Sequence, residues 1–251
     1  MRALKNRKKK PSGLKLAIAY GLAPNQFGFC GPQGRENRRK LRDYLKNKIS
    51  DREIKAVLKK FEAAFAYLKL IAEKNNIADP FDYKVVEAFW VGNKLLDKVN
   101  SHDLKKMVMD KFTRPGLLSN NQAKERLKLI PKNSRPHHSF HVYIFGTITG
   151  RVSLEEARMK DLCRVGWGRV KKIVRAKNNS KIIVECQPII KNKKFTFGRF
   201  RMKEIKWDKT IVPEVKLGDW VSFHWNCLAQ TLSNRQADNL EKYTRNTLKL
   251  L

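Results

Sequence analysis

Cysteine is scarce in this sequence, and its four cysteines do not lie close together. Cys30, Cys163, Cys186 and Cys227 are spread over 251 residues and form no CxxC motif. A chain of this length buries a hydrophobic core without needing disulfides. The scattered cysteines therefore favour a reducing compartment, and we expect a cytoplasmic protein.

Long apolar runs are missing as well. No stretch approaches the ~20 apolar residues that a membrane-spanning helix requires. The N-terminus imitates a signal peptide, with a basic head before a short apolar stretch, but Lys15 interrupts that stretch. No A-x-A-like cleavage site follows it. We expect neither a cleaved leader nor a membrane partner.

Acidic residues are few relative to basic ones. The chain has 55 Lys and Arg against 23 Asp and Glu, which gives a formal net charge of +32. A surplus of this size creates a positive field that attracts polyanions. A general lysine-rich bias, spread evenly over a solvated surface, explains the same number. Charge alone leaves both interpretations open.

Common catalytic motifs are also lacking. The sequence contains no Walker-type P-loop, no G-x-G-x-x-G, no H-E-x-x-H and no G-x-S-x-G. This pattern favours a binding or transfer protein over a turnover enzyme.

The first half of the chain is typical of helices. Ser50 and Glu53 form a capping box, and apolar residues recur at helical spacing from Ile54 to Ile71. Asp79 and Pro80 predict the N-cap and first residue of another helix. We expect shorter helices at 12–22, 35–48 and 101–112, and a linker with one helix at 113–136. These elements define a basic N-terminal arm at 1–12 and a helical domain at 13–135.

The pattern changes to β-structure after Pro136. Residues 139–148 alternate and are rich in aromatic and β-branched side chains, which predicts a strand in a connector spanning 136–162. Short strands separated by turn residues then predict a small OB-like barrel at 163–251. This range ends in a C-terminal helix that starts at Ser233. The expected fold class is α+β. The predicted barrel strands are 164–175, 181–190, 194–205 and 220–225.

Two motifs of this barrel resemble those of the HypC/HupF family of hydrogenase-maturation iron chaperones. They are CRVGWGRV, which begins at Cys163, and VKLGDWVSFHW, which contains His224. The family has an OB-like barrel and carries an iron with cyanide and carbonyl ligands toward the [NiFe]-hydrogenase large subunit. By position, Cys163 matches its essential cysteine and His224 its histidine. Two departures stand out: Cys163 is internal rather than next to the initiator Met, and the residues around it lack the family's usual proline.

The resemblance implies a metallocentre-assembly or iron-transfer factor in hydrogenase maturation. Its cofactor would be iron with diatomic ligands, and its partners the hydrogenase large subunit or maturation proteins. A thiolate and an imidazole suit such a metal, and two protein ligands leave coordination positions free. The hypothesis predicts the Cys163 sulfur within about 6 Å of a His224 ring nitrogen, and a thiol that solvent or a partner can reach. Otherwise Cys163 is a small hydrophobe and His224 is hydrogen-bonded in the barrel wall.

The whole chain also resembles an uncharacterised prokaryotic family over residues 12–250. The motifs that carry this resemblance are GFCGP, FWVGN and PHHSFHV. It implies a shared fold but no activity.

The third of these motifs contains a histidine cluster. His137, His138 and His141, with Cys30 as a fourth ligand, form a second and weaker candidate site for another transition metal. In an extended strand His137 and His141 would lie about 13 Å apart, so one ion requires the chain to bend there. The alternative is a strand whose histidines only cap its beginning.

A different function follows if the barrel binds single-stranded nucleic acid. OB-like barrels do so with aromatic platforms in a cationic groove. Non-specific binding through the net charge is the weaker form of this hypothesis. The candidate contacts are Trp167, Arg169, Lys171, Lys172, Phe195, Phe197, Arg199, Arg201 and Trp207.

Overall fold

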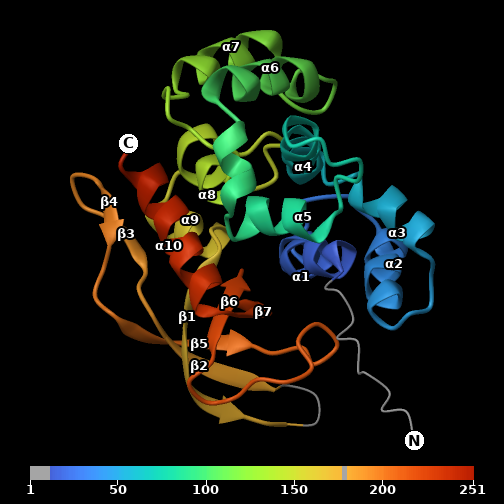
Figure 1. The fold of residues 1–251 in the computed structure, drawn as a ribbon, viewed down its shortest axis with the longest axis vertical. Helices are drawn as coiled ribbons and strands as arrows, with labels where there is room; N and C mark the ends of the chain where they lie inside the picture. The colour runs from blue at the N-terminus through green and yellow to red at the C-terminus, as the bar shows by residue number, and fades with distance from the viewer. Residues whose placement is uncertain (1–11, 177–179) are drawn as a thin grey trace, which may run out of the picture.

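A helical half packs against a five-stranded barrel in the computed structural model, which describes residues 12–176 and 180–251 (Figure 1). This arrangement confirms the expected α+β class. The predicted N-terminal arm lies outside the described residues except for Ser12. Among the described residues, no helix combines the length and apolarity needed to cross a membrane.

Side-chain caps begin most helices of the first half, as the sequence predicts. Ser12 accepts a hydrogen bond from the Lys15 backbone and starts the first helix, and the Ser50–Glu53 capping box starts the third. The elements are α1 Gly13–Gln26, α2 Arg35–Leu45, α3 Asp51–Leu58, α4 Glu62–Lys74, α5 Tyr83–Trp90, the 3₁₀-helix η1 Lys94–Lys98, α6 Ser101–Phe112 and α7 Asn120–Lys128.

Two helix boundaries differ from the prediction. The apolar pattern from Ile54 to Ile71 belongs to two helices, because the chain turns between Leu58 and Glu62. The cap of α5 is Asp82 rather than Asp79. The Asp79 carboxylate instead accepts from the Phe81 backbone and from the Lys55 ammonium, which fixes the preceding turn.

The strand predicted at 139–148 is wrong. This segment forms a helical turn, α8 His138–Phe140, followed by a π-helical turn, η2 His141–Phe145. The His137 ring accepts a hydrogen bond from the Ser139 backbone and caps the turn locally. Val142 and Tyr143 are both buried, which a half-buried strand with alternating faces does not allow. The connector continues to α9 Ala157–Cys163.

The barrel confirms the predicted OB-like architecture. Its strand order is β1-β2-β5-β7-β6, closed between β1 and β6, with β5 and β7 as the parallel pair. Gly168 in β1 is required because a Cβ there would lie 2.2 Å from the Glu185 carbonyl oxygen. The strands are β1 Gly166–Val174, β2 Lys181–Cys186, β5 Arg201–Lys206, β6 Trp220–His224 and β7 Cys227–Leu232.

The segments predicted as two long strands are each divided. A separate hairpin of β3 Ile189–Lys191 and β4 Phe195–Phe197 projects from the barrel, so 181–190 and 194–205 each contain two strands. Strand β7 was not predicted.

A hydrophobic cluster joins the helical half to one side of the barrel, whose interior forms a separate cluster. The C-terminal helix α10 Asn234–Leu248 begins at the predicted Ser233–Gln236 capping box and runs from the barrel past α9 and α8 (Figure 1). Leu240 and Tyr243 of this helix, with Val165 and Ala229 of the barrel, belong to the same buried cluster as α1 and α5. Cys163 belongs to another buried cluster, which includes Ala23 of α1 and Trp225 and so also lies between the two halves.

A candidate metal site between the helices and the barrel

Cys163 and His224 come together at one end of the barrel. Cys163 ends α9 just before β1, and His224 ends β6, the strand that pairs with β1. Their ligand atoms, with one from His138, all lie within 4.8 Å of one another. The predicted proximity of Cys163 and His224 is confirmed, and His138 from α8 is added as a third potential ligand.

The orientation of His224 depends on a proline in α1. Pro24 has no N–H, so it cannot bond to the Tyr20 carbonyl four residues earlier in the helix. Nδ1 of His224 lies 2.7 Å from that freed oxygen, which is hydrogen-bond distance. Metal-binding histidines are commonly oriented by such a bond from the other ring nitrogen.

The second nitrogen of His224 has an unusual neighbour. Nε2 lies 2.7 Å from the Cys163 carbonyl oxygen, yet a neutral imidazole has a single N–H and can donate to only one of the two carbonyls. Burial lowers the pKa of His224 to about 4, so the ring is neutral at pH 7. At one of the two contacts a ring lone pair therefore faces a carbonyl oxygen.

His138 is packed but not hydrogen-bonded. Its ring lies 4.5 Å from the Trp90 ring and 5.1 Å from the His224 ring, measured between centroids. Its Nδ1 is buried without a hydrogen-bond partner among the residues that the structure describes. Burial, then the neighbouring histidines, lowers its pKa well below the ordinary value. A buried nitrogen without a partner costs free energy unless a ligand pairs with it.

The Cys163 thiol is enclosed, contrary to the expectation that solvent or a partner can reach it. The residue is 4% exposed and packs with Val142 and Trp225, beneath the helical half. Burial raises the pKa of this thiol well above its ordinary value, and the nearby Cys30 adds to the effect. The Trp225 indole lies close enough to lower that pKa, although its N–H completes no hydrogen bond. A thiolate bound to a metal would accept that N–H.

The histidine cluster of the second candidate site is divided. His138 joins Cys163 and His224, whereas the Nδ1 of His137 bonds to the Ser139 hydroxyl and its ring stacks on Tyr243. His141 receives a contact from the Tyr67 hydroxyl at 3.3 Å. Within residues 12–176 and 180–251, neither His137, His141 nor Cys30 comes within ligand distance of the three-residue group.

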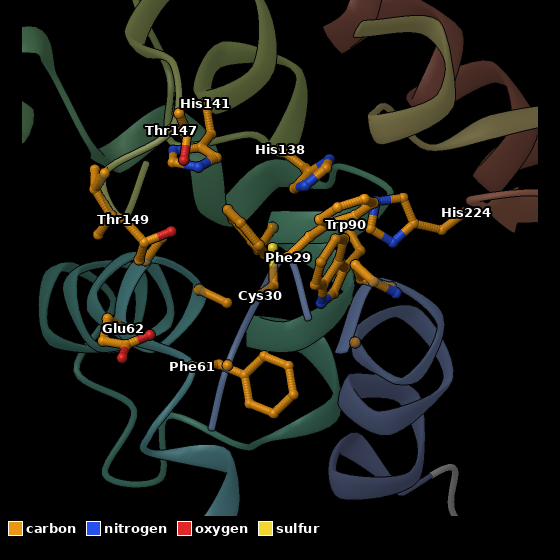
Figure 2. A pocket seen from close by; sticks show the side chains of 17 residues that line it. Phe29, Cys30, Phe61, Glu62, Trp90, His138, His141, Thr147, Thr149 and His224 are labelled. Carbon is orange, nitrogen blue, oxygen red and sulfur yellow. The ribbon is translucent and has the colours of Figure 1, made fainter. Parts of the chain in front are cut away.

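Cys30 and His141 instead line a small pocket beside that group. The pocket has a volume of about 60 Å³, and His138 and His224 form part of its wall. Figure 2 shows these two rings with Trp90 on one side, His141 and Thr147 on another, and Glu62 and Thr149 farther away. Phe29, Phe61, Phe89 and Trp90 make most of the lining apolar.

The aromatic residues proposed as nucleic-acid platforms are largely covered. Trp207 is buried in the barrel core and donates its indole N–H to the Val212 carbonyl, so it cannot stack on a base. Trp167 and Phe197 pack against each other beneath Arg164, and Phe195 packs on Tyr143. The prediction of Trp207 as a binding residue is wrong.

The predicted basic residues are mostly exposed. Arg169 lies over the Trp220 ring, and Arg199 is exposed. Arg201 pairs with the buried carboxylate of Asp161. Lys171 and Lys172 border an open groove on the barrel that is also lined by Arg175 and Lys216.

Comparison with known proteins identifies the family of this chain. Residues 9–251 match the family of unknown function DUF6390, and the chain belongs to that family. No curated protein and no solved structure matches it. The resemblance of the barrel to the HypC/HupF family therefore has no support from these comparisons.

Proposed function

We propose that this DUF6390 member binds one transition-metal ion through Cys163, His138 and His224. The observation that carries the proposal is the convergence of three buried ligand atoms from α8, α9 and β6 within 4.8 Å. Segments distant in sequence supply them, and the buried clusters between the two halves hold them together.

A bound cation would relieve two unfavourable features of this region. It would pair with a ring nitrogen of His138 and create a thiolate for the Trp225 N–H. At His224 it would replace one of the two carbonyl contacts of the ring, because a neutral ring donates to only one of them. One thiolate and two imidazoles favour iron, zinc or copper over magnesium or calcium, which prefer oxygen ligands.

Metallocentre assembly is the narrower proposal. As a hydrogenase-maturation factor, the protein would hold iron with diatomic ligands and pass it to the hydrogenase large subunit. Because Cys163 is enclosed, a client would have to open the site before transfer. Anaerobic purification beside a maturation system should then yield iron-bound protein, and Cys163→Ala should abolish the iron.

The metal content of the purified protein tests the broader proposal. We expect about one transition-metal ion per chain by elemental mass spectrometry, and its loss in Cys163→Ser and in His224→Asn. Cys186→Ser is the matched control, because Cys186 is a buried barrel cysteine outside the group. Circular dichroism establishes that each variant folds. Metal-free wild-type protein, or full metal in folded Cys163→Ser, would refute the proposal.

Nucleic-acid binding is a second candidate, carried by the basic groove of the barrel. Lys171, Lys172, Arg175 and Lys216 line it together, with Glu214 as its single acidic residue. Phosphates would bind there without aromatic stacking, so the affinity should be non-specific and strongly salt-dependent.

Single-stranded DNA binding tests this second candidate. Affinity should fall steeply as salt rises from about 50 to about 200 mM because binding releases counterions. Lys171→Ala/Lys172→Ala should weaken it more than Lys59→Ala/Lys60→Ala, an equal charge change on the helical half. Equal effects would assign the affinity to net charge alone, and no binding at low salt would dismiss it.

A further inference from the structure

We infer that the cleft between α1, α2 and the β5–β6 connection binds a small organic anion, in which a phosphate, carboxylate or sulfonate is joined to an aromatic or other apolar group. This cleft shares no lining residue of the described chain with the metal group, with the pocket beside that group or with the basic groove of the barrel. The inference is therefore independent of both functions proposed above.

The inner surface of the cleft is apolar and comes from both halves of the molecule. The β5–β6 connection passes below α1 in the view of Figure 1. Leu22 and Ala23 of α1 line one side of the cleft, and Trp207 and Leu228 line the other. The volume is about 480 Å³, which lies within the range of small-molecule sites. The apolar part of a ligand can be buried between these two sides.

Three basic side chains line the same cleft from three different segments. Arg42 comes from α2, Lys206 from the end of β5 and Lys209 from the β5–β6 connection, and all three residues are exposed. None of them forms an ion pair with another residue of the described chain. The Lys209 ammonium lies 5.6 Å from the centre of the Trp207 ring, so positive charge borders the apolar surface directly. An anionic group attached to an apolar one fits this arrangement.

The single acidic residue among the described lining does not neutralise these cations. One carboxylate oxygen of Asp208 accepts hydrogen bonds from the backbone N–H and the hydroxyl of Thr210, which fixes the turn that follows β5. Three basic side chains and one acidic side chain leave the lining with a net charge of +2. The cleft therefore favours a ligand with one or two negative charges and repels a cationic one.

Two fluorescent probes with the same rings test this ligand chemistry. Anilinonaphthalenesulfonate has a sulfonate group, and phenylnaphthylamine lacks it. We expect a single sulfonate-probe site per chain, and affinity for the uncharged probe weaker by about tenfold or more. Phenyl phosphate should displace the sulfonate probe, whereas inorganic phosphate at the same concentration should not, because it has no apolar group. Equal affinity for the two probes, or equal displacement by the two phosphates, would overturn the inference.

A pair of charge variants shows whether the cleft supplies the positive charge. Arg42→Ala/Lys206→Ala should weaken binding of the sulfonate probe by about tenfold and leave the affinity for phenylnaphthylamine unchanged. Arg52→Ala/Lys60→Ala makes an equal charge change at exposed positions outside the cleft and should bind both probes as the wild type does. Circular dichroism establishes that both variants fold. Equal weakening in the two variants would assign the binding to the net charge of the chain and would overturn the inference.

Protection of a cysteine from alkylation locates the bound probe. Cys227 is a half-buried residue that lines the cleft, and Cys30 is half-buried outside it. Saturating sulfonate probe should slow the reaction of Cys227 with N-ethylmaleimide and leave that of Cys30 unchanged, as measured by peptide mass spectrometry. Bound probe with an unchanged rate at Cys227 occupies another surface, which would also overturn the inference.

Discussion

Pro24 connects a local property of one residue to the geometry of the metal site. A proline inside a helix removes one backbone hydrogen bond, and here the freed acceptor is the Tyr20 carbonyl, which lies 2.7 Å from Nδ1 of His224. The loss of one helical hydrogen bond is accompanied by a contact that positions the His224 ring.

Replacement of Pro24 tests this coupling. Pro24→Ala restores a backbone N–H that competes for the Tyr20 carbonyl, so His224 should be held less firmly. We expect metal affinity to fall, up to the roughly tenfold typical of losing such an orienting bond. Competition with a chromophoric chelator measures it. Pro115→Ala, at an exposed position away from the site, should leave the affinity unchanged. An unchanged affinity in Pro24→Ala would show that the side-chain packing alone orients His224.

The protonation states of the ligands predict how metal binding varies with pH. Between pH 6 and 8 the metal-free site has a protonated Cys163, because burial raises that pKa, and neutral histidines, because burial lowers theirs. Binding then displaces one proton, from the thiol. The apparent dissociation constant should decrease about tenfold per pH unit over this range. A flat profile would mean that Cys163 is not a ligand in the metal-bound state.

At this scale the sequence identified only part of the site. The resemblance of the two barrel motifs to the HypC/HupF family paired Cys163 with His224, and the two residues do flank paired strands. The sequence groups His138 with its neighbours His137 and His141. The local sequence does not reveal the helical turn that directs these three rings to different places. Pro24 is a further sequence signal, because a proline inside a helix leaves a backbone carbonyl without its helical partner.

At the scale of elements, the corner between α9 and β1 places Cys163. Asp161 in α9 and Arg164 after it form a buried ion pair at 2.8 Å, with side chains 8% and 3% exposed. The Asp161 carboxylate also accepts from the Ile189 backbone, and Arg164 donates to the Gln187 carbonyl. Asp161 and Arg164 lie on either side of Cys163 in the sequence. Their bonds connect the end of α9 to the segment between β2 and β3.

Removal of Asp161 tests that corner. Asp161→Ala leaves the Arg164 guanidinium buried without its counter-ion, and we expect the free energy of unfolding to fall by about 3–5 kcal/mol. Glu241→Ala removes the exposed partner of Arg245 on α10 and should cost less than about 1 kcal/mol. Urea unfolding measures both. Similar small losses in the two variants would show that the buried pair does not hold the corner.

Element prediction succeeded where local chemistry decides and failed where tertiary packing does. The capping boxes at Ser50 and Ser233 are satisfied within four residues, so their helices begin as predicted. Residues 139–148 have a strand-like composition, yet they pair with no strand of the part of the chain that the structure describes, and 139–145 fold into helical turns with most side chains buried. Composition cannot reveal that absence of a partner strand.

At the scale of the whole molecule, the site exists only because the two halves fold as one unit. His138 and the Tyr20 carbonyl come from the helical half, and Cys163 and His224 from the boundary and wall of the barrel. A description of the chain as independent domains at 13–135 and 163–251 would divide these groups. Three buried histidines and the half-buried His141 lie within the fold, which makes its stability sensitive to acid.

The direction of that sensitivity follows from the histidine pKa values. Burial lowers the pKa to about 3 for His137 and about 4 for His141 and His224, and well below the ordinary value for His138. The unfolded chain, with histidine pKa near 6.5, binds protons that the folded one does not. The free energy of unfolding of the metal-free protein should thus be constant between about pH 6.5 and pH 8, where the cysteines of the unfolded chain are still protonated, and fall below pH 6.5 until the folded-state histidine pKa values are reached.

Urea unfolding of metal-free protein at pH 7.5 and pH 5 measures this fall. Each buried histidine contributes up to about 1.4 kcal/mol per pH unit below 6.5, so the protein should be several kcal/mol less stable at pH 5. The carboxyl groups with a lowered pKa, such as Asp79, do not titrate in this window because their ordinary value is already near 4. His137→Gln removes a buried histidine outside the ligand group and should reduce the difference between the two pH values by one histidine's share. Equal stability of the wild-type protein at both pH values would mean that the core accepts the histidine charges, and a protonated His224 could then donate to both the Tyr20 and the Cys163 carbonyls without a metal.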